Sequence, residues 1–310
     1  MTTASNCLQG FGYLLISVVT ASANIPLAIF LARSGKARED VVSTAMLSLT
    51  VSDLCLGTVV TAASAVFAWI QPTVVVNAAL VVQGSLWHAC TICSICHLAL
   101  MSALKCFIIV RPMTYAGVLT DRFRTVVIVL IWIGTFVVVL GANIAGARWM
   151  MDRYVYLAAL VPNRDVSIGL RFLETCVIFA ASSIVMIISY VKIFFVVRQH
   201  HLRLGQLDAI STSAAQRTQN QGWTASIRSA RSLFVVCIAF YLCYIPANVN
   251  NIGFALPYWF LIASRWIILS SALINSLLYV VCNRSTRREF GKMFFGKWLR
   301  TFGVSPDIIT

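Results

Sequence analysis

The residues best suited to chemistry are few and lie within apolar sequence. Asp53 falls deep inside a long apolar run, where a charge is costly and usually functional. A second group could bind a metal ion through one imidazole and three thiols: His97, Cys90, Cys93 and Cys96. On a helix, only Cys93 and His97 share a face, and neighbouring thiols in apolar helices usually serve as packing residues. We therefore expect no metal site in this cluster.

Composition excludes a soluble protein. The chain is 59% hydrophobic and 11% charged, whereas soluble domains carry about 25% charged residues. The net charge of +14 is divided among short clusters between apolar runs, unlike the continuous basic surface of a nucleic-acid-binding protein. Four His residues and one acid within the apolar runs assemble no nucleophile–base pair. We expect an integral membrane protein that is not an enzyme and has no nucleic-acid partner.

Seven apolar runs are long enough to cross a bilayer as helices, which takes about 20 residues. The backbone must satisfy its own hydrogen bonds in hydrocarbon, and the runs lack the alternation of transmembrane strands. The predicted spans are Phe11 to Leu31, Ser43 to Ile70, Val74 to Val110, Val126 to Gly146, Leu170 to Val197, Arg231 to Leu256 and Tyr258 to Cys282. The prediction is an all-α membrane protein with an outer tail (1–10), a helical domain (11–282) and a cytoplasmic amphipathic helix and tail (283–310).

Basic residues indicate the orientation, because they concentrate on the cytoplasmic side of membrane proteins. With the N-terminus outside, the outer face keeps only Arg148, Arg153, Arg164, Arg171 and Arg265 among the 24 Lys and Arg residues. The cytoplasmic face receives all the others, including Lys105, Arg111, Arg228, Arg231 and the stretch from Arg284 to Arg300. The longest loops are expected at residues 147–169 outside and 198–227 inside.

Short motifs recur in order along the predicted helices. They are Ala23-Asn24-Ile25-Pro26-Leu27, Leu49-Thr50-Val51-Ser52-Asp53, Trp132, Tyr190-Val191-Lys192-Ile193, Phe240-Tyr241-Leu242-Cys243-Tyr244-Ile245-Pro246 and Asn275-Ser276-Leu277-Leu278-Tyr279, with Phe290 eleven residues further on. Together they resemble the motifs of the rhodopsin-like (class A) G-protein-coupled receptors. The resemblance covers nearly the whole chain and implies a seven-transmembrane helix bundle with a short amphipathic eighth helix.

Several positions depart from that family's pattern. Its Asp-Arg-Tyr triplet falls on Leu104-Lys105-Cys106, so the acid is lost and Arg is replaced by Lys. Its helix VII Pro, helix V Pro and helix VI Trp fall on Ser276, Ser182 and Tyr244. Its extracellular disulfide is missing at both ends, because Leu80 stands at the head of helix III and residues 147–169 contain no Cys. The chain resembles a divergent, orphan-type member of no particular subfamily.

The resemblance implies that Asp53 lies in a polar cluster with Ser94, Ser271 and Asn275. In the family this cluster can hold a sodium ion and stiffen one state, and hard oxygen donors suit such an ion. Alternatively, Asp53 is protonated or hydrogen-bonded between helices without an ion. No other metal or cofactor is expected.

The resemblance also assigns residues to activation. Pro246 should kink its helix, and with Phe240 and Tyr244 it forms a candidate hinge. Tyr190 and Tyr279 hold the active state in the family. Lys105 lacks the planar fork of Arg, which leaves three alternatives: a loosened resting state, impaired coupling, or a Lys that only marks the membrane interface. Arg111, Arg228 and Arg231 would face the G protein.

By alignment, the ligand pocket contains Trp87, His88, Thr91, Glu174, Thr175, Asn248, Asn251 and Arg265. Aminergic receptors have Asp where Trp87 stands, and opsins have the retinal Lys where Leu269 stands, which disfavours both ligand types. Arg265 could pair with an anionic ligand or with Glu174 across an empty pocket. The slightly basic outer face favours an acidic or neutral small ligand.

The resemblance thus implies a plasma-membrane receptor that senses a small ligand and activates a heterotrimeric G protein through movement of helix VI. The alternative is a seven-helix protein that no longer couples and acts as a dimer partner or decoy. Either would contact anionic membrane lipid through its basic cytoplasmic face. A transporter or channel would need more intramembrane charge than Asp53.

Overall fold

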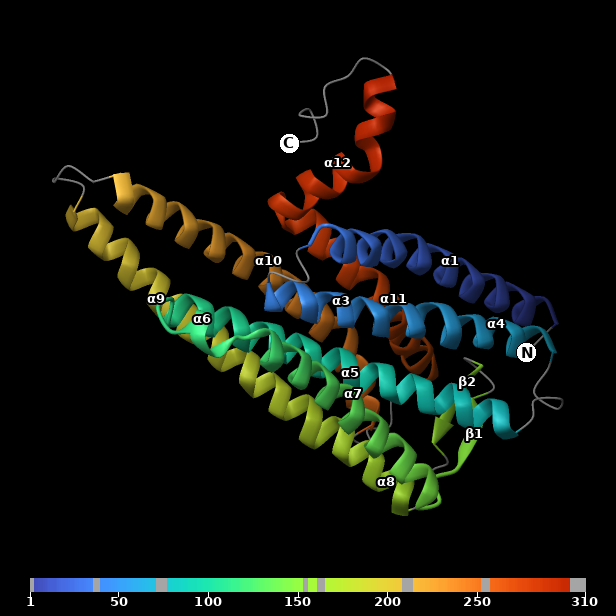
Figure 1. The fold of residues 1–310 in the computed structure, drawn as a ribbon. Coiled ribbons are helices and arrows are strands. Elements are labelled where there is room, and N and C mark those ends of the chain that lie inside the picture. Colours follow the sequence, from blue (N-terminus) through green and yellow to red (C-terminus); the bar gives the residue numbers. More distant parts are fainter. Residues whose placement is uncertain are drawn as a thin grey trace.

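Seven helical spans in the computed structural model are long and apolar enough to cross a membrane. The structure describes residues 3–35, 40–70, 77–152, 156–160, 165–207, 214–251 and 257–301. Its helices are α1 (Thr3–Arg33), α3 (Val41–Leu54), η1 (Cys55–Val60), α4 (Thr61–Ile70), α5 (Asn77–Val110), α6 (Tyr115–Val118), α7 (Asp121–Ile144), α8 (Asp165–Phe172), η2 (Leu173–Phe179), α9 (Ala180–Leu207), α10 (Ala214–Asn251), α11 (Tyr258–Cys282) and α12 (Arg284–Thr301). The seven predicted spans are confirmed, and α12 leaves the bundle after α11 (Figure 1).

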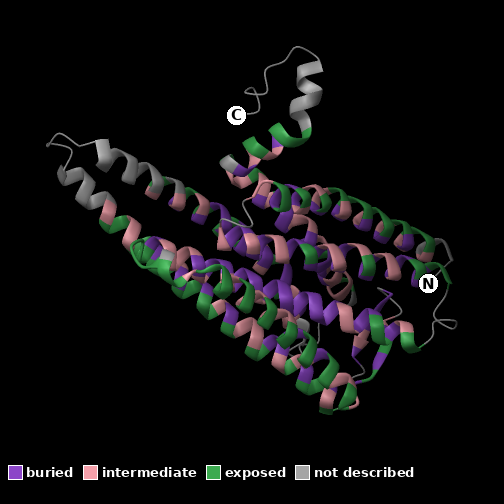
Figure 2. Ribbon diagram, viewed as in Figure 1, coloured by how far each residue is buried: buried purple, intermediate pink, exposed green. Residues whose placement is uncertain are grey.

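Helix α5 lies at the centre of the bundle. In its most apolar stretch 67% of the residues are buried within the protein, against 11% for α7, whose residues mainly face outward (Figure 2). Helices α3, α7, α9 and α10 pack on α5, whereas α1 packs on α3, α4 and α11.

Helix ends differ from the predicted spans wherever the helix extends beyond apolar sequence. α1 begins at Thr3 rather than near Phe11, so most of the expected tail is helical. α9 continues to Leu207 and α10 begins at Ala214, so most of the loop expected at 198–227 is helix. The reason is that apolar composition marks the part of a helix inside hydrocarbon, whereas a helix can continue in polar sequence beyond it.

Two spans contain wider π-helical turns, which often occur at functional sites. η1 begins two residues after Asp53, and there Thr61 Oγ1 donates to the carbonyl of Leu56, five residues earlier. Gly57 lies in η1 where a Cβ atom would come within 2.2 Å of Thr20, so only Gly permits this approach to α1. η2 contains Glu174, which is buried.

A short β-hairpin, between α7 and α8 in the chain, covers the end of the bundle that carries the N-terminus; this end is named the outer end and the opposite end the inner end. Strands β1 (Trp149–Asp152) and β2 (Leu157–Leu160) are antiparallel, with Trp149 opposite Leu160. The hairpin was not predicted from the sequence. It lies beside α5, near the end of the bundle that carries the N-terminus (Figure 1).

Candidate functional site

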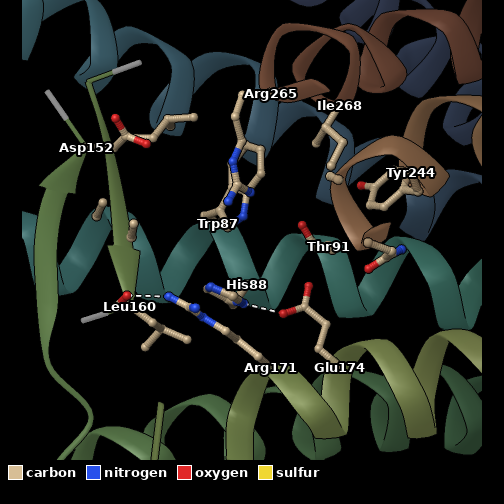
Figure 3. Close-up of a pocket in the computed structure, with 15 residues that line it drawn as sticks. Trp87, His88, Thr91, Asp152, Leu160, Arg171, Glu174, Tyr244, Arg265 and Ile268 are labelled. Atoms are coloured by element: carbon tan, nitrogen blue, oxygen red, sulfur yellow. Dashed lines mark hydrogen bonds and ion pairs between the residues drawn. The ribbon is translucent and has the colours of Figure 1, made fainter. Parts of the chain in front are cut away.

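A small cavity of about 40 Å³ lies under the hairpin, among α5, α8, η2, α10 and α11. Its lining is Trp87, His88, Thr91, Asp152, Leu157, Ala158, Ala159, Leu160, Arg171, Glu174, Tyr244, Ala247, Asn248, Arg265 and Ile268. This volume holds a few water molecules, so a larger ligand requires the lining side chains to move apart. Polar side chains supply most of the surface of the cavity, and polar groups that converge in this way fix the orientation of a ligand. Figure 3 shows these side chains converging from the hairpin and the surrounding helices.

Two side chains join the walls of the cavity. His88 Nδ1 contacts Glu174 Oε2, which links α5 to η2, and both residues are buried. Arg171 Nη2 donates to the carbonyl of Leu160 at 2.5 Å, which links α8 to β2. Both contacts are visible in Figure 3. The first gives Glu174 a partner within the protein, and the second fixes Arg171 at the rim.

Arg265 points from α11 into the cavity without a counterion in contact. Its guanidinium carbon lies 6.0 Å from the ring centre of Trp87, a cation–π distance. It forms no hydrogen bond or ion pair with any residue that the structure describes, and Glu174 contacts His88 instead. The geometry therefore does not contain the predicted alternative of an Arg265–Glu174 pair.

The hairpin is held on α5 without a disulfide. Gln83 Nε2 donates to the Val60 carbonyl at 3.2 Å and to Ser64 Oγ at 2.9 Å, while Gln83 Oε1 accepts from Ala158 N at 2.9 Å. Trp149 Nε1 donates to Asn143 Oδ1 at 2.7 Å. Hydrogen bonds thus hold the hairpin on α5 through Gln83 and on α7 through Asn143.

The Trp149 indole lies against the backbone of α5. A Cβ atom on Gly84 would come within 2.2 Å of the ring, so this approach requires Gly. The Trp149 ring also contacts His88, and the two ring centres are 5.4 Å apart. Helix α5 therefore positions the hairpin that covers the cavity and also lines the cavity itself.

Most of the predicted pocket residues line this cavity. The exceptions are Thr175, which donates to Asn248 Oδ1 at 3.2 Å, and Asn251, whose side chain lies outside the described residues. Sequence reasoning missed Asp152, Arg171 and the hairpin residues. The signal for Asp152 and Arg171 was their charge in the outer loop, but nothing local indicated that this loop folds over the cavity.

A polar centre lies deeper in the bundle around Asp53. Ser94 Oγ donates to Asp53 Oδ1 at 3.2 Å, and Asn275 Nδ2 donates to Asp53 Oδ2 at 3.1 Å. The buried Asn275 Oδ1 has no hydrogen-bond partner among the described residues. Ser271, four residues before Asn275, is buried, but its hydroxyl donates to the Ile268 carbonyl at 2.6 Å. Three of the four predicted members are thus in direct contact.

Helix α10 connects the cavity with this core. Tyr244 lines the cavity and stacks on Phe240 one turn further in, with ring centres 4.0 Å apart. Both rings are buried. Pro246 lies inside α10 just outward of the pair and removes one backbone donor. The two rings therefore form a continuous aromatic contact from the cavity to the buried core.

Polar contacts between helices at the inner end of the bundle involve Ser232 and Tyr190. Ser232 Oγ donates to the Cys282 carbonyl at 2.6 Å, which joins α10 to α11. The Tyr190 hydroxyl lies 3.8 Å from Cys237 Sγ, and Tyr279 is buried. Lys105 is half-buried and forms no ion pair with a described residue, while Arg111, Arg228 and Arg231 are exposed.

The thiol–imidazole cluster shows a packing arrangement. His97 Nδ1 lies 2.8 Å from the Cys93 carbonyl and 3.4 Å from its sulfur. No group of three or more His, Cys, Asp or Glu residues within the described part of the chain could hold a metal ion.

Comparison with known proteins identifies the class. Residues 23–279 match the model of the 7 transmembrane receptor (rhodopsin family), and the chain therefore belongs to this family. The crystal structure of squid rhodopsin superposes with a TM-score of 0.84 at 16% identity, covering 97% of this chain and 83% of that chain. At that identity the likeness concerns the fold alone. The family consists of receptors rather than enzymes.

Curated relatives are more distant in sequence than the fold suggests. Trace amine-associated receptor 7d of Rattus norvegicus is 22% identical over 230 residues, which is 69% of this chain and 63% of that receptor. Trace amine-associated receptor 7b of Mus musculus is 24% identical over 220 residues, 67% of this chain and 60% of that receptor. Melatonin receptor type 1A of Phodopus sungorus is 21% identical over 194 residues, 60% and 51% respectively. The matches span less than two thirds of the length of these relatives.

Proposed function

We propose that the protein is a plasma-membrane receptor that binds a small ligand in the cavity under the hairpin and activates a heterotrimeric G protein. The N-terminus is outside, and the basic ends of α9, α10 and α12 are cytoplasmic, following the distribution of Lys and Arg. The ligand acts by moving α10. A receptor dimer remains compatible with this function.

The Tyr244–Phe240 stack carries the proposal. Tyr244 touches the cavity, Phe240 belongs to the buried core, and their ring centres are 4.0 Å apart on the helix that contains Pro246. A ligand that contacts Tyr244 can therefore favour one of two packings of α10, which is what transmission to the inner end requires.

The ligand class follows from the charges in the cavity. Glu174 contacts His88, whereas Arg265 has no ion pair within the described residues. The names of the mammalian relatives point to amines, but Trp87 stands where aminergic receptors have Asp. We therefore propose an acidic or neutral ligand, with Arg265 as the group that binds an acidic one.

The polar centre fits a sodium ion. Asp53 and Ser94 present hard oxygens, and the buried Asn275 Oδ1 lacks a partner among the described residues, as an unfilled ligand position would. Sodium there would stabilise the inactive packing. Asp53→Asn should remove any effect of sodium, compared with potassium, on thermal unfolding and basal signalling.

The decisive test is G-protein dissociation across subtypes in cells with measured surface expression. Basal or ligand-driven dissociation that changes in Asp53→Asn and falls in Lys105→Ala supports the receptor. Lys105→Arg should increase signalling if the missing guanidinium fork limits coupling; unchanged or lower output at equal expression contradicts that explanation of Lys105.

One observation favours the alternative of a non-coupling partner or decoy. Lys105 replaces the family's Arg, follows Leu104 rather than an acid, and has no ion pair with a described residue. Silence with every G-protein subtype despite good surface expression would establish the alternative and reject the receptor.

A further inference from the structure

An apolar groove lies between α9 and α10 at their inner halves, away from the ligand cavity. It has a volume of about 210 Å³ and is lined by Ile193, Phe194 and Val197 on α9 and by Ala230, Arg231 and Phe234 on α10, among others. The groove falls inside two membrane-spanning segments, Asp165–His200 and Ser226–Val249. Its surroundings in a bilayer are therefore acyl chains.

Packing explains why the groove exists. The Tyr190 ring packs on Phe234, with centres 4.8 Å apart, and closes the groove toward the middle of the bundle. Ile109, Ile193 and Ala230 form a small buried cluster beneath it. Because the Ala230 side chain is short, it leaves space at the bottom of the groove. Phe194 and Phe234, which are 62% and 42% exposed, form apolar walls.

Arg231 gives the groove a charged end. The side chain is exposed and forms no hydrogen bond or ion pair with any residue that the structure describes. No Asp or Glu occurs anywhere in the sequences of α9 and α10, whereas Lys192, Arg198 and Arg228 add exposed positive charge near the same ends. The two helices offer Arg231 no acid, so its counterion must come from elsewhere.

We propose that this groove binds an anionic phospholipid of the cytoplasmic leaflet. One acyl chain lies between Phe194 and Phe234, and Arg231 donates hydrogen bonds to the headgroup phosphate. A zwitterionic headgroup offers the same phosphate but neutralises it with its own ammonium group, so the net negative charge of an anionic headgroup gives the preference. The guanidinium fork suits a phosphate, and each basic residue near an anionic leaflet contributes about 1 kcal/mol. The leaflet assignment rests on the orientation given under Proposed function; the site itself does not require G-protein coupling.

The position of the lipid links it to activation. It contacts both α9 and α10, so any movement of α10 changes the walls of the groove. By reciprocity, a lipid that prefers one width of the groove shifts α10 toward the matching packing.

Photo-cross-linking tests the site in the full chain. The protein is placed in phosphatidylcholine nanodiscs that contain a trace of photoreactive phosphatidylserine or, in parallel, photoreactive phosphatidylcholine. Labelled peptides are then mapped by mass spectrometry. We expect labelling of residues 190–197 and 227–234, with about fivefold more from phosphatidylserine, which corresponds to about 1 kcal/mol. Equal labelling by the two lipids overturns the proposal.

Matched variants separate the headgroup from the chain. Arg231→Gln should abolish the phosphatidylserine preference, whereas Arg33→Gln, which removes an exposed charge from the inner end of α1, should keep it.

Val197→Trp fills the groove and should prevent labelling by both lipids, whereas Val185→Trp on an exposed part of α9 should not. Identical behaviour of Arg231→Gln and Arg33→Gln rejects the site. If a variant does not fold, the comparison of the two lipids on the unaltered chain still decides.

Discussion

The two ends of the bundle are built differently. At the outer end, Gln83 accepts a hydrogen bond from the hairpin and donates to Val60 and Ser64, the Trp149 indole lies against Gly84, and His88 and Glu174 join two further walls. At the inner end, Ser232 supplies one hydroxyl bond between α10 and α11, and a groove separates α9 from α10. The difference is that contacts from the hairpin cover the first end, whereas an apolar groove lies between two helices at the second.

The largest expected effect comes from Gln83→Leu, which conserves volume but removes the hydrogen bond between the hairpin and the Gln83 side chain of α5. The buried Ala158 N–H loses its side-chain partner, while the Val60 carbonyl keeps its bond from Ser64, and an unsatisfied buried group costs about 1–3 kcal/mol. Thermal unfolding of the purified protein should occur at a lower temperature. Gln199→Leu on the exposed face of α9 is the control. Equal stability of the two variants would mean that the outer end is not fixed by Gln83.

A somewhat smaller effect is expected for Gly84→Ala. The new methyl group would overlap the Trp149 ring, and overpacking of this kind costs about 1–3 kcal/mol. The hairpin should move away from α5, with lower thermal stability and weaker ligand binding. Gly134→Ala on α7, where a Cβ atom meets nothing within 4 Å, should leave both unchanged. Tolerance of Gly84→Ala would show that the roof adapts.

The smallest effect should come from Ser232→Ala at the inner end. Loss of one neutral hydrogen bond costs about 1 kcal/mol, which should raise basal G-protein dissociation by up to about fivefold if the bond holds α10 against α11. Ser189→Ala removes only a bond within α9 and serves as the control. Lower basal output from Ser232→Ala would reverse the proposed role of this contact.

The sequence predicted the helical spans because a run of about 20 apolar residues is a local property. It could not predict where α9 and α10 end, since helix outside the hydrocarbon carries no such pattern. The Asp53 contacts with Ser94 and Asn275 were inferred from family motifs. The hairpin, Asp152 and Arg171 were missed because the placement of a loop depends on contacts with distant residues such as Gln83. The partner of Arg265 was likewise undecidable, because Glu174 and His88 meet only in the folded bundle.

The non-covalent roof has a consequence for biogenesis. Residues 147–169 contain no Cys, and all cysteines in the described residues are free thiols. Closure of the cavity therefore needs no thiol oxidation during synthesis, and reductants such as dithiothreitol should leave its shape intact. A cell or cell-free extract without oxidative folding enzymes can assemble this outer surface.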